Sequence, residues 1–350
     1  MLKRRNAGAV AMLTAVSLFL PRSAAAQELI GAGSSFAQPI IMRWGMLYTS
    51  LPGEGGQVGS VDGGLDYEPT GSLGGLMAVA QGTVDFGLSD VATSPADLAR
   101  LGLIQFPLVS GGVAVVTSLR GLGANQRLRM DGATLARIYL GEIRNWSHPA
   151  IRSLNPELTL PDAPIAVFQR EDASGTTFNF ARYLAASSPD WRMQVGVNQS
   201  VIWPVGSSAR GTRRLVDRVL ATPNAIGFVE VGLANRQGLQ VALLQNAAGR
   251  FVAPTQENIS QALVTRQWDE ASHFFEAGAE PSGPDAYPIA VTVYALMRRR
   301  PAASRRTRHV LQFFDVALTE MGPEALPLGF VPLPEDIVRN VQKYWRTNAR

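Results

Sequence analysis

The side chains that could bind an anion are concentrated in one segment, Arg170-Glu171-Asp172-Ala173-Ser174-Gly175-Thr176. Arg170 supplies a fixed positive charge, and Asp172 could simply pair with it or hold its guanidinium group in position for a ligand. We expect a strand at residues 163–168 to lead into this segment and a helix at residues 177–186 to follow it. Backbone N–H groups at a helix start, hydroxyl groups and an arginine together favour an anion-binding site.

Two further Gly/Ser-rich turns lie earlier in the chain, at Gly31–Phe36 and Thr70–Gly75. Each precedes apolar residues at helical spacing, within residues 40–48 and 73–80. One such turn is most simply a helix cap, because serine and glycine are ordinary capping residues. Three strand–turn–helix units in one chain instead indicate a pocket that surrounds a small oxyanion with several helix N-termini.

A carboxylate, Asp90, follows a strand that we expect at residues 84–88. A carboxylate beside an anion is repulsive unless the anion carries a proton that it can donate. Phosphate keeps at least one proton near neutral pH and sulfate keeps none, so Asp90 could accept a hydrogen bond from phosphate and reject sulfate. A solvated aspartate, or one at the start of a helix, is the alternative interpretation, and both remain open from the residues alone.

The expected strands and helices alternate, which predicts an α/β fold with ligands bound beyond the carboxyl ends of the strands. Gly/Ser/Arg-rich residues 206–214 and Gly-rich residues 51–65 are expected to be loops. Other strands are expected at residues 29–30, within 105–119, and at 225–231 and 288–297. Other helices are expected from Pro95 to before Gly102, and at residues 132–139, 215–220, 303–321 and 335–345.

The first 26 residues are expected to be a cleaved signal peptide. They contain the basic group Lys3-Arg4-Arg5, an apolar stretch from Ala7 to Leu20, and the small residues Ala24-Ala25-Ala26. General secretion and twin-arginine export both remain open. The sequence contains no cysteine, which excludes a lipoprotein anchor, disulfides and cysteine metal sites.

The remaining 324 residues carry 28 basic and 28 acidic side chains, so nucleic-acid binding is not expected. A chain of this length usually forms two domains. No later apolar run reaches the roughly 18 residues that a membrane helix needs. These features predict an exported, soluble, periplasmic protein.

The sequence offers little support for catalysis or for a bound metal. The three histidines, His148, His273 and His309, do not have metal-ligand spacing and are distant in sequence from the three turns. A serine–histidine nucleophile is possible in principle, but neither a G-x-S-x-G elbow nor a P-loop consensus is present. We therefore expect a binding protein without cofactor or metal, and keep a secreted phosphatase as the alternative.

Taken together, the motifs resemble the phosphate-specific substrate-binding proteins of bacterial ABC importers over nearly all of the chain after residue 26. The segments that carry the resemblance are Gly31–Phe36, Gly71–Gly75, Val84–Asp90, Gln105–Pro107, Ile138–Trp146, Arg170–Thr176, Ala225–Glu230 and Tyr287–Ile289.

This resemblance implies a two-lobe periplasmic binding protein fold of type II-like topology, in which each lobe is a mixed sheet flanked by helices. It implies that residues 27–109 and 289–350 form lobe I, that residues 110–288 form lobe II, and that two crossover segments join them. It also implies a set of phosphate ligands, with Asp172 orienting the arginine. The implied ligands are Ser35, Phe36, Ser72, Asp90, Arg170, Ser174, Gly175 and Thr176.

The implied function is reception of inorganic phosphate by a monomer that delivers it to the membrane permease and ATPase subunits of an ABC importer. A receptor for another oxyanion, such as sulfate or molybdate, is a further alternative that Asp90 disfavours. Leu73 stands where the family commonly has a small or hydroxyl residue. Arg210, Arg213 and Arg214 occupy a loop that the family tends to fill with glycine and asparagine, which alters the charge at the rim of the site.

Overall fold

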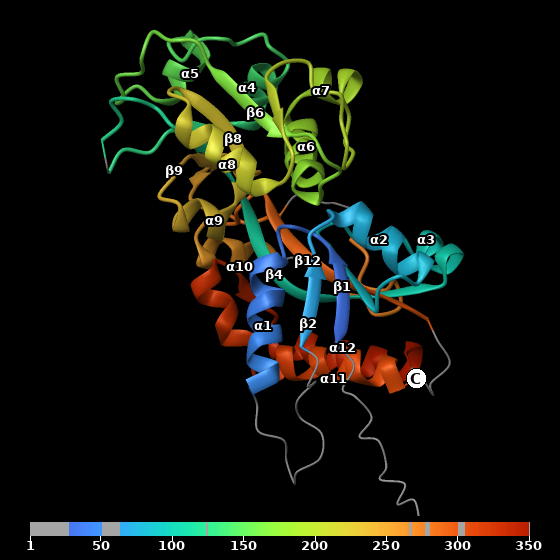
Figure 1. Ribbon diagram of the computed structural model, residues 1–350. Coiled ribbons are helices and arrows are strands. Elements are labelled where there is room, and N and C mark those ends of the chain that lie inside the picture. Colours follow the sequence, from blue (N-terminus) through green and yellow to red (C-terminus); the bar gives the residue numbers. More distant parts are fainter. Residues whose placement is uncertain are drawn as a thin grey trace, which may run out of the picture.

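The computed structural model describes residues 28–50, 64–123, 125–264, 266, 268–276, 281–299 and 305–349. The expected signal peptide lies outside these residues, as does the expected loop at 51–65 except for Gly64 and Leu65. The described chain forms two α/β lobes, one above the other in Figure 1, which confirms the predicted fold class.

The first lobe is built from both ends of the described chain. Its sheet has the order β2-β1-β3-β12-β4, in which β2 and β3 are parallel to β1 and β12 is antiparallel to β3. Its early elements are β1 (Leu29–Gly33), α1 (Gln38–Ser50), β2 (Leu65–Glu68), α2 (Ser72–Gln81), β3 (Phe86–Ser89) and α3 (Pro95–Leu101). Its late elements are β12 (Ala290–Arg298), α11 (Arg305–Thr319), the 3₁₀ helix η2 (Gly322–Leu328), β13 (Val331–Pro332) and α12 (Glu335–Asn348).

The second lobe contains the middle of the chain, and its main strands continue the sheet in the order β4-β8-β6-β7. Its first half contains β5 (Arg129–Met130), α4 (Gly132–Tyr139), α5 (Pro149–Leu154), β6 (Ala166–Arg170), α6 (Gly175–Ser187) and α7 (Pro189–Gln194). It continues with β7 (Ser207–Ala209), α8 (Thr212–Ala221), β8 (Ala225–Glu230), α9 (Val231–Arg236) and β9 (Gln240–Val241). The strands β10 (Leu243–Gln245) and β11 (Phe251–Val252) follow, and the helix α10 (Gln256–Val264) then packs on β4, β12 and β13 beside the first lobe.

A single long strand, β4 (Leu103–Thr117), runs from one lobe into the other, and all 15 of its residues are buried. Residues 103–112 pair with β12, and residues 113–117 pair with β8. Gly111 lies where the strand passes close to aromatic side chains: a Cβ there would be 2.8 Å from Cζ of Phe36. The Gly-Gly pair inside this Val-rich strand therefore reflects tight packing at the junction of the lobes.

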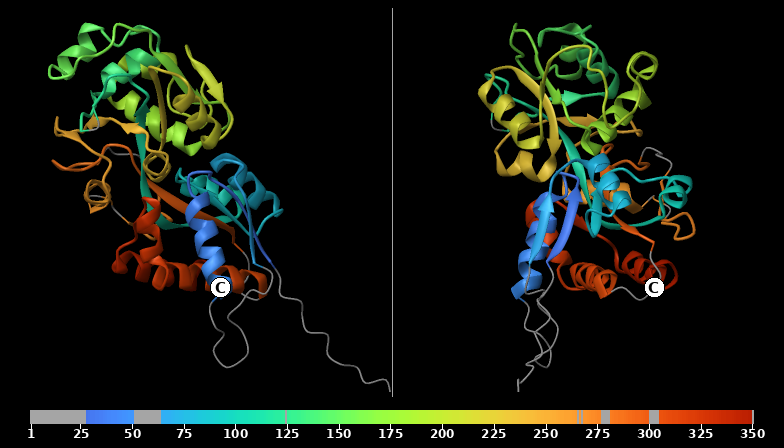
Figure 2. Two further views of the ribbon diagram at one scale, coloured as in Figure 1. Left: turned by 60° about the vertical axis from the view of Figure 1, so that its left-hand side comes forward. Right: turned by 45° about the vertical axis from the view of Figure 1, so that its right-hand side comes forward.

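Each lobe has an aromatic core that fixes its helices on the sheet. In the first lobe Phe86 makes an edge-to-face contact with Phe314 of α11, with ring centroids 5.1 Å apart. In the second lobe Phe180 of α6 stacks on Phe228 of β8 at 4.2 Å. Helices α11 and α12 lie at the end of the first lobe that is farthest from the second lobe (Figure 2). This arrangement leaves the starts of α1, α2 and α6 at the boundary between the lobes.

The expected elements are present, with some corrections. The expected loop at residues 206–214 is wrong in part: it contains β7, and α8 begins at Thr212 because Gly211 makes the turn with φ of 79°. The short helices α5, α7, α9 and α10 were not expected, and they have six to nine residues each, too few to give a clear apolar period. Within the described ranges, no helix has both the length and the apolar character needed to cross a membrane.

Candidate functional site

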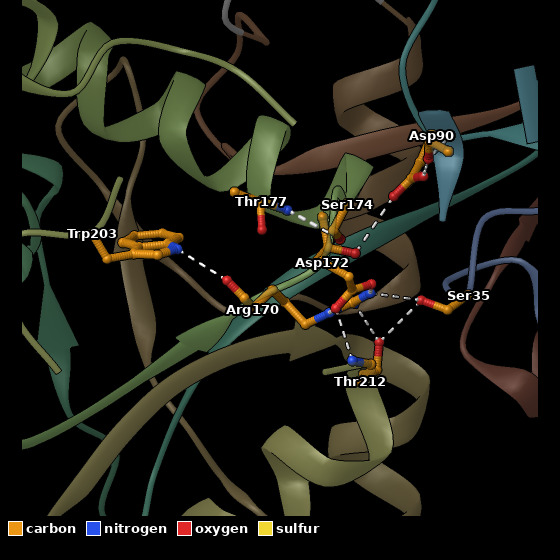
Figure 3. Close-up of polar contacts among 11 residues, drawn as sticks. Ser35, Asp90, Arg170, Asp172, Ser174, Thr177, Trp203 and Thr212 are labelled. Carbon is orange, nitrogen blue, oxygen red and sulfur yellow. Dashed lines mark hydrogen bonds and ion pairs between the residues drawn. The ribbon is translucent and has the colours of Figure 1, made fainter. Parts of the chain in front are cut away.

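The three Gly/Ser turns follow strands and open helices, as expected. They connect β1 to α1, β2 to α2 and β6 to α6. The three strands run parallel to their neighbours in the sheet. Their carboxyl ends bring the turns together where the lobes meet, and Figure 3 shows the side chains of Ser35, Asp90, Arg170 and Thr212 gathered there.

Arg170 is the last residue of β6, and only 2% of it is exposed. Its Nε donates to Oδ1 of Asp172 at 2.8 Å and its Nη2 donates to Oδ2 of the same carboxylate. Its Nη1 donates to Oγ1 of Thr212 at 2.8 Å, and its main-chain oxygen accepts from Nε1 of Trp203 at 3.0 Å. The guanidinium group is therefore held in one orientation before any ligand arrives.

Asp172 pairs with the guanidinium group of Arg170, and its role in orienting this group for a ligand stays a prediction. Its Oδ1 also accepts from the Gly211 N–H at 2.8 Å. Partial burial raises the pKa of Asp172, but the hydrogen bonds and charge of Arg170 and the Gly211 N–H outweigh burial and leave the pKa below its ordinary value. The pair is thus an ionised carboxylate bound to a guanidinium group.

Asp90 lies one residue beyond β3 and is 4% exposed, so the alternative of a solvated aspartate is excluded. Ser72 Oγ donates to its Oδ1, and Thr176 Oγ1 donates to its Oδ2 at 3.5 Å. Burial raises the pKa of Asp90, and hydrogen bonds from Ser72 and Ser34 and the charge of Arg170 reverse only part of that rise. The carboxyl group is therefore a buried acceptor surrounded by hydroxyl groups.

The two lobes touch at this cluster. Arg170 Nη2 donates to Oγ of Ser35 in the first lobe at 3.3 Å, and this hydroxyl lies 3.3 Å from Oγ1 of Thr212 in the second. A Cβ on Gly175 would lie 2.2 Å from Oδ1 of Asp90 and 2.6 Å from Oγ of Ser72. The contacts describe a closed arrangement in which α6 begins directly against the first lobe.

The structure brings together most of the residues singled out in the sequence, and their role as phosphate ligands stays a prediction. Ser174 caps α6 by accepting from the Thr177 N–H at 3.5 Å, and its own N–H donates to the main-chain oxygen of Gln199 at 2.8 Å. The ring of Phe36 is buried edge-to-face against Phe330, with centroids 5.5 Å apart. This side chain has no hydrogen-bonding group, so only the main chain of Phe36 can donate to an anion.

Sequence reasoning missed three residues of this cluster. Thr212 bonds to Arg170, Ser34 hydrogen-bonds to Asp90, and Asn179 Nδ2 donates to the main-chain oxygen of Asp90 at 2.7 Å. The Gly211-Thr212 turn could have been found, because it is another Gly/hydroxyl pair at a helix start. Asn179 has no such signal, because it lies one turn inside α6.

A buried acid, Glu230, lies at the junction of the lobes, where it pairs with Val113 of β4. Burial raises the pKa of Glu230 to about 8, and the nearby charge of Arg236, whose Nη2 lies 3.4 Å from Oε1, lowers it only in part. At neutral pH the Glu230 side chain is therefore mostly protonated and uncharged. The junction thus does not carry a second buried negative charge close to Asp90.

The cluster combines a buried cation with hydroxyl and N–H donors, which are groups that favour an anion. Among the described residues, no group of three or more histidine, cysteine, aspartate or glutamate side chains is placed to hold a metal ion. His148 caps α5 by accepting from the Ala150 N–H at 3.2 Å, and Nδ1 of His273 is hydrogen-bonded to the hydroxyl of Tyr344. These two histidines therefore have structural contacts outside the cluster.

Known proteins with similar sequences place the chain in a family. A family model described as a PBP superfamily domain matches residues 21–320. The phosphate-binding protein PstS of Xylella fastidiosa is 35% identical over 323 residues, which cover 92% of this chain and 86% of that protein. The phosphate-binding protein PstS of Pasteurella multocida is 35% identical over 325 residues, which cover 93% of this chain and 92% of that protein.

Solved structures share the fold. The high-affinity periplasmic phosphate-binding protein PfluDING, solved with bound phosphate, has a TM-score of 0.70 at 20% identity, covering 91% of this chain and 93% of that one. The chain therefore belongs to the PBP superfamily and, within it, to the family of PstS phosphate-binding proteins. The family resemblance read from the sequence motifs is confirmed.

Proposed function

We propose that this protein binds inorganic phosphate between its lobes and releases it to an ABC importer. The observation that supports the proposal best is the pairing of a buried acceptor with a buried cation: Asp90 belongs to one lobe and Arg170 to the other. The expected ligands are Ser35, the Phe36 N–H, Ser72, Asp90, Arg170, Ser174, the Gly175 N–H and Thr176. Arg170 supplies charge, and the hydroxyl and N–H groups supply neutral donors.

The acceptor is what makes such a site selective. A protonated phosphate oxygen can donate to Asp90, whereas sulfate would place an unprotonated oxygen against the carboxylate. A site built to accept a hydrogen bond rejects a ligand that lacks the donor, because its buried acceptor is then left unpaired. The same reasoning disfavours molybdate and other fully deprotonated oxyanions.

Isothermal titration of the protein with phosphate and with sulfate tests this function. We expect phosphate to bind and sulfate to bind far more weakly. In Asp90→Asn the preference for phosphate over sulfate should narrow by about 100-fold or more, because the amide no longer repels sulfate. The control is Asp66→Asn, which changes an exposed carboxylate on β2. A phosphate preference that is the same in both variants would remove Asp90 from this role.

The proposal includes the cellular setting of the receptor. We propose that residues 27–109 with 289–350 and residues 110–288 are the two lobes, and that ligand binding favours their closed arrangement. The closed monomer would then dock on the permease and its ATPase subunits in the periplasm. The delivery step is tested by measuring phosphate uptake in cells that have this protein as their only phosphate receptor, and in the same cells after the protein is removed. Equal rates of uptake in the two would contradict delivery by this protein.

The proposed role is binding without turnover. The curated relatives are named for phosphate binding. The residues around Asp90 and Arg170 hold each other in hydrogen bonds, and neither His148 nor His273 is directed to them. Hydrolysis of a chromogenic phosphoester by the purified protein would contradict this view and favour the secreted phosphatase.

A further inference from the structure

A concentrated group of arginines lies on the first lobe, where β12 ends and α11 begins. The sequence from Arg298 to Arg308 contains six arginines and no acid, although basic and acidic side chains are equal in number after residue 26. Of the described members, Arg299, Arg305 and Arg308 are exposed. Arg298 and Arg306 are half-buried and line the same cavity. We call these five described residues the arginine patch.

Most of the positive charge of the arginine patch is not neutralised. Arg306 donates from Nη2 to Oδ2 of Asp85 at 2.6 Å and to the main-chain oxygen of Glu28 at 2.9 Å. The other four arginines form no ion pair with any residue that the structure describes. On the neighbouring helix α3, Arg100 pairs with Asp97 at 2.9 Å and adds no net charge. Five cations of the patch thus face two acids, Asp85 and the exposed Glu28.

The start of α11 is an unfavourable place for these charges. Arg305, Arg306 and Arg308 lie in its first turn, which contains no acid. The N-terminus of a helix carries a partial positive charge, so cations there lower the stability of the helix and an anion raises it. The stability of α11 therefore does not explain the arginines. The helix start and the guanidinium groups both favour an anionic partner.

The position of the patch indicates which anion it meets. The described chain begins at Glu28, which is hydrogen-bonded to Arg306, so the preceding chain joins the lobe at the patch. The apolar stretch of the expected leader ends at Leu20, eight residues before Glu28, a distance of at most about 28 Å in extended chain. This stretch is expected to enter the membrane during export. The patch is then within reach of the membrane surface.

We propose that the arginine patch is a docking surface for a membrane that contains anionic lipid. The guanidinium groups form paired hydrogen bonds with the phosphate oxygens of the lipid head groups. The negative surface potential of such a membrane attracts a polybasic surface. Helix α11 lies at the end of the first lobe that is farthest from the second lobe (Figure 1), so the docking does not depend on the proposed function.

Co-sedimentation with lipid vesicles tests this docking. The exported protein, purified after cleavage of the leader, is mixed with vesicles in a buffer without phosphate. We expect binding to phosphatidylcholine vesicles that contain about 30% phosphatidylglycerol, and none to phosphatidylcholine alone. Salt at about 0.5 M should release the bound protein, because it screens exposed charges. Equal binding to both kinds of vesicle, or binding that salt does not reduce, would overturn the proposal. Binding to soluble polyphosphate without binding to anionic vesicles would overturn it in favour of a soluble polyanion.

A triple variant tests whether the patch is the binding surface. Replacing its three exposed arginines with glutamine should weaken binding to anionic vesicles at least about tenfold, because each arginine near such a surface contributes roughly fivefold. The matched control makes the same change at three exposed arginines of the second lobe and should bind like the unchanged protein. Equal losses in the two triple variants would overturn the patch as the docking surface. The variants are Arg299→Gln, Arg305→Gln and Arg308→Gln, and in the control Arg127→Gln, Arg152→Gln and Arg218→Gln.

Two further measurements separate docking from folding and from phosphate binding. Arg299 gives up one hydrogen bond, from its Nη2 to Oδ1 of Asn348 at 2.9 Å. The loss of two cations from the first turn of α11 acts in the opposite direction, so the thermal midpoint should stay the same or rise by about 1–2 °C. The variant should also bind phosphate with the Kd of the unchanged protein. Failure of the unchanged protein to bind phosphate would overturn the proposed function alone.

Discussion

Replacing Gly175 with alanine should weaken phosphate binding about 100-fold or more and leave the folded protein intact. The added Cβ would lie 2.2 Å from Oδ1 of Asp90 and 2.6 Å from Oγ of Ser72, and both atoms are held in the first lobe. Overpacking a rigid site costs about 1–3 kcal/mol or more, and here that cost falls on the closed arrangement alone. The same methyl group also occupies the space in which a ligand must approach Asp90.

The fold of this variant should not suffer, because Gly175 is the first residue of α6 and has no left-handed backbone conformation. Alanine is the better helix former there. The control is Gly322→Ala at the start of η2, where the nearest atom, Cβ of Pro332, is 3.5 Å from the added Cβ. Titration calorimetry and thermal unfolding check the result. An unchanged phosphate Kd in Gly175→Ala, with normal unfolding, would contradict the closed arrangement.

The positions of the anion-binding turns could be predicted because their signals are local. Glycine and serine before an apolar period of 3.6 residues mark a helix start, as at Gly31–Phe36 and Thr70–Gly75. Parallel strands then place such starts at one edge of a sheet. These two rules are enough to predict from the amino-acid sequence alone that Ser35, Ser72 and Arg170 lie close together.

The contacts between the lobes could not be predicted in this way. Asn179 reaches Asp90 across 89 positions of the sequence, and Thr212 meets Ser35 across 177. Nothing in the local pattern of either residue indicates its partner, because the contact depends on how the two lobes are oriented. The burial of Asp90 could not be predicted from the sequence for the same reason, because helix α6 of the other lobe covers this residue.

The long strand β4 illustrates a third case. A Val-rich run between residues 105 and 119 indicates a buried strand, but its period gives no sign that it belongs to two lobes. Only the pairing shows that β12 accompanies residues 103–112 and β8 accompanies residues 113–117. The reason for glycine at position 111 also comes only from the structure, because the ring of Phe36 leaves no room there for a Cβ.

Replacing Arg170 with glutamine should lower the affinity for phosphate about 1000-fold. Two effects act in the same direction: the ligand loses the cation, and the carboxylate of Asp172 loses the partner that neutralises it. Removing one member of a buried charge pair costs about 3–5 kcal/mol, most of it from the charge that is left unpaired. Arg170→Lys should recover little, because the single ammonium nitrogen of lysine has three donors and cannot reproduce the two-point contact with Asp172 together with the bonds to Thr212 and Ser35.

The two effects can be separated by a double variant. Arg170→Gln with Asp172→Asn removes the unpaired carboxylate as well as the cation, so it should bind phosphate about tenfold or more tighter than Arg170→Gln alone. Arg152→Gln, at an exposed arginine of α5, is the control for loss of one positive charge. If the double variant binds no better than the single one, Asp172 does not repel the anion. Its role is then limited to the orientation of Arg170, and the loss in the single variant measures the cation alone.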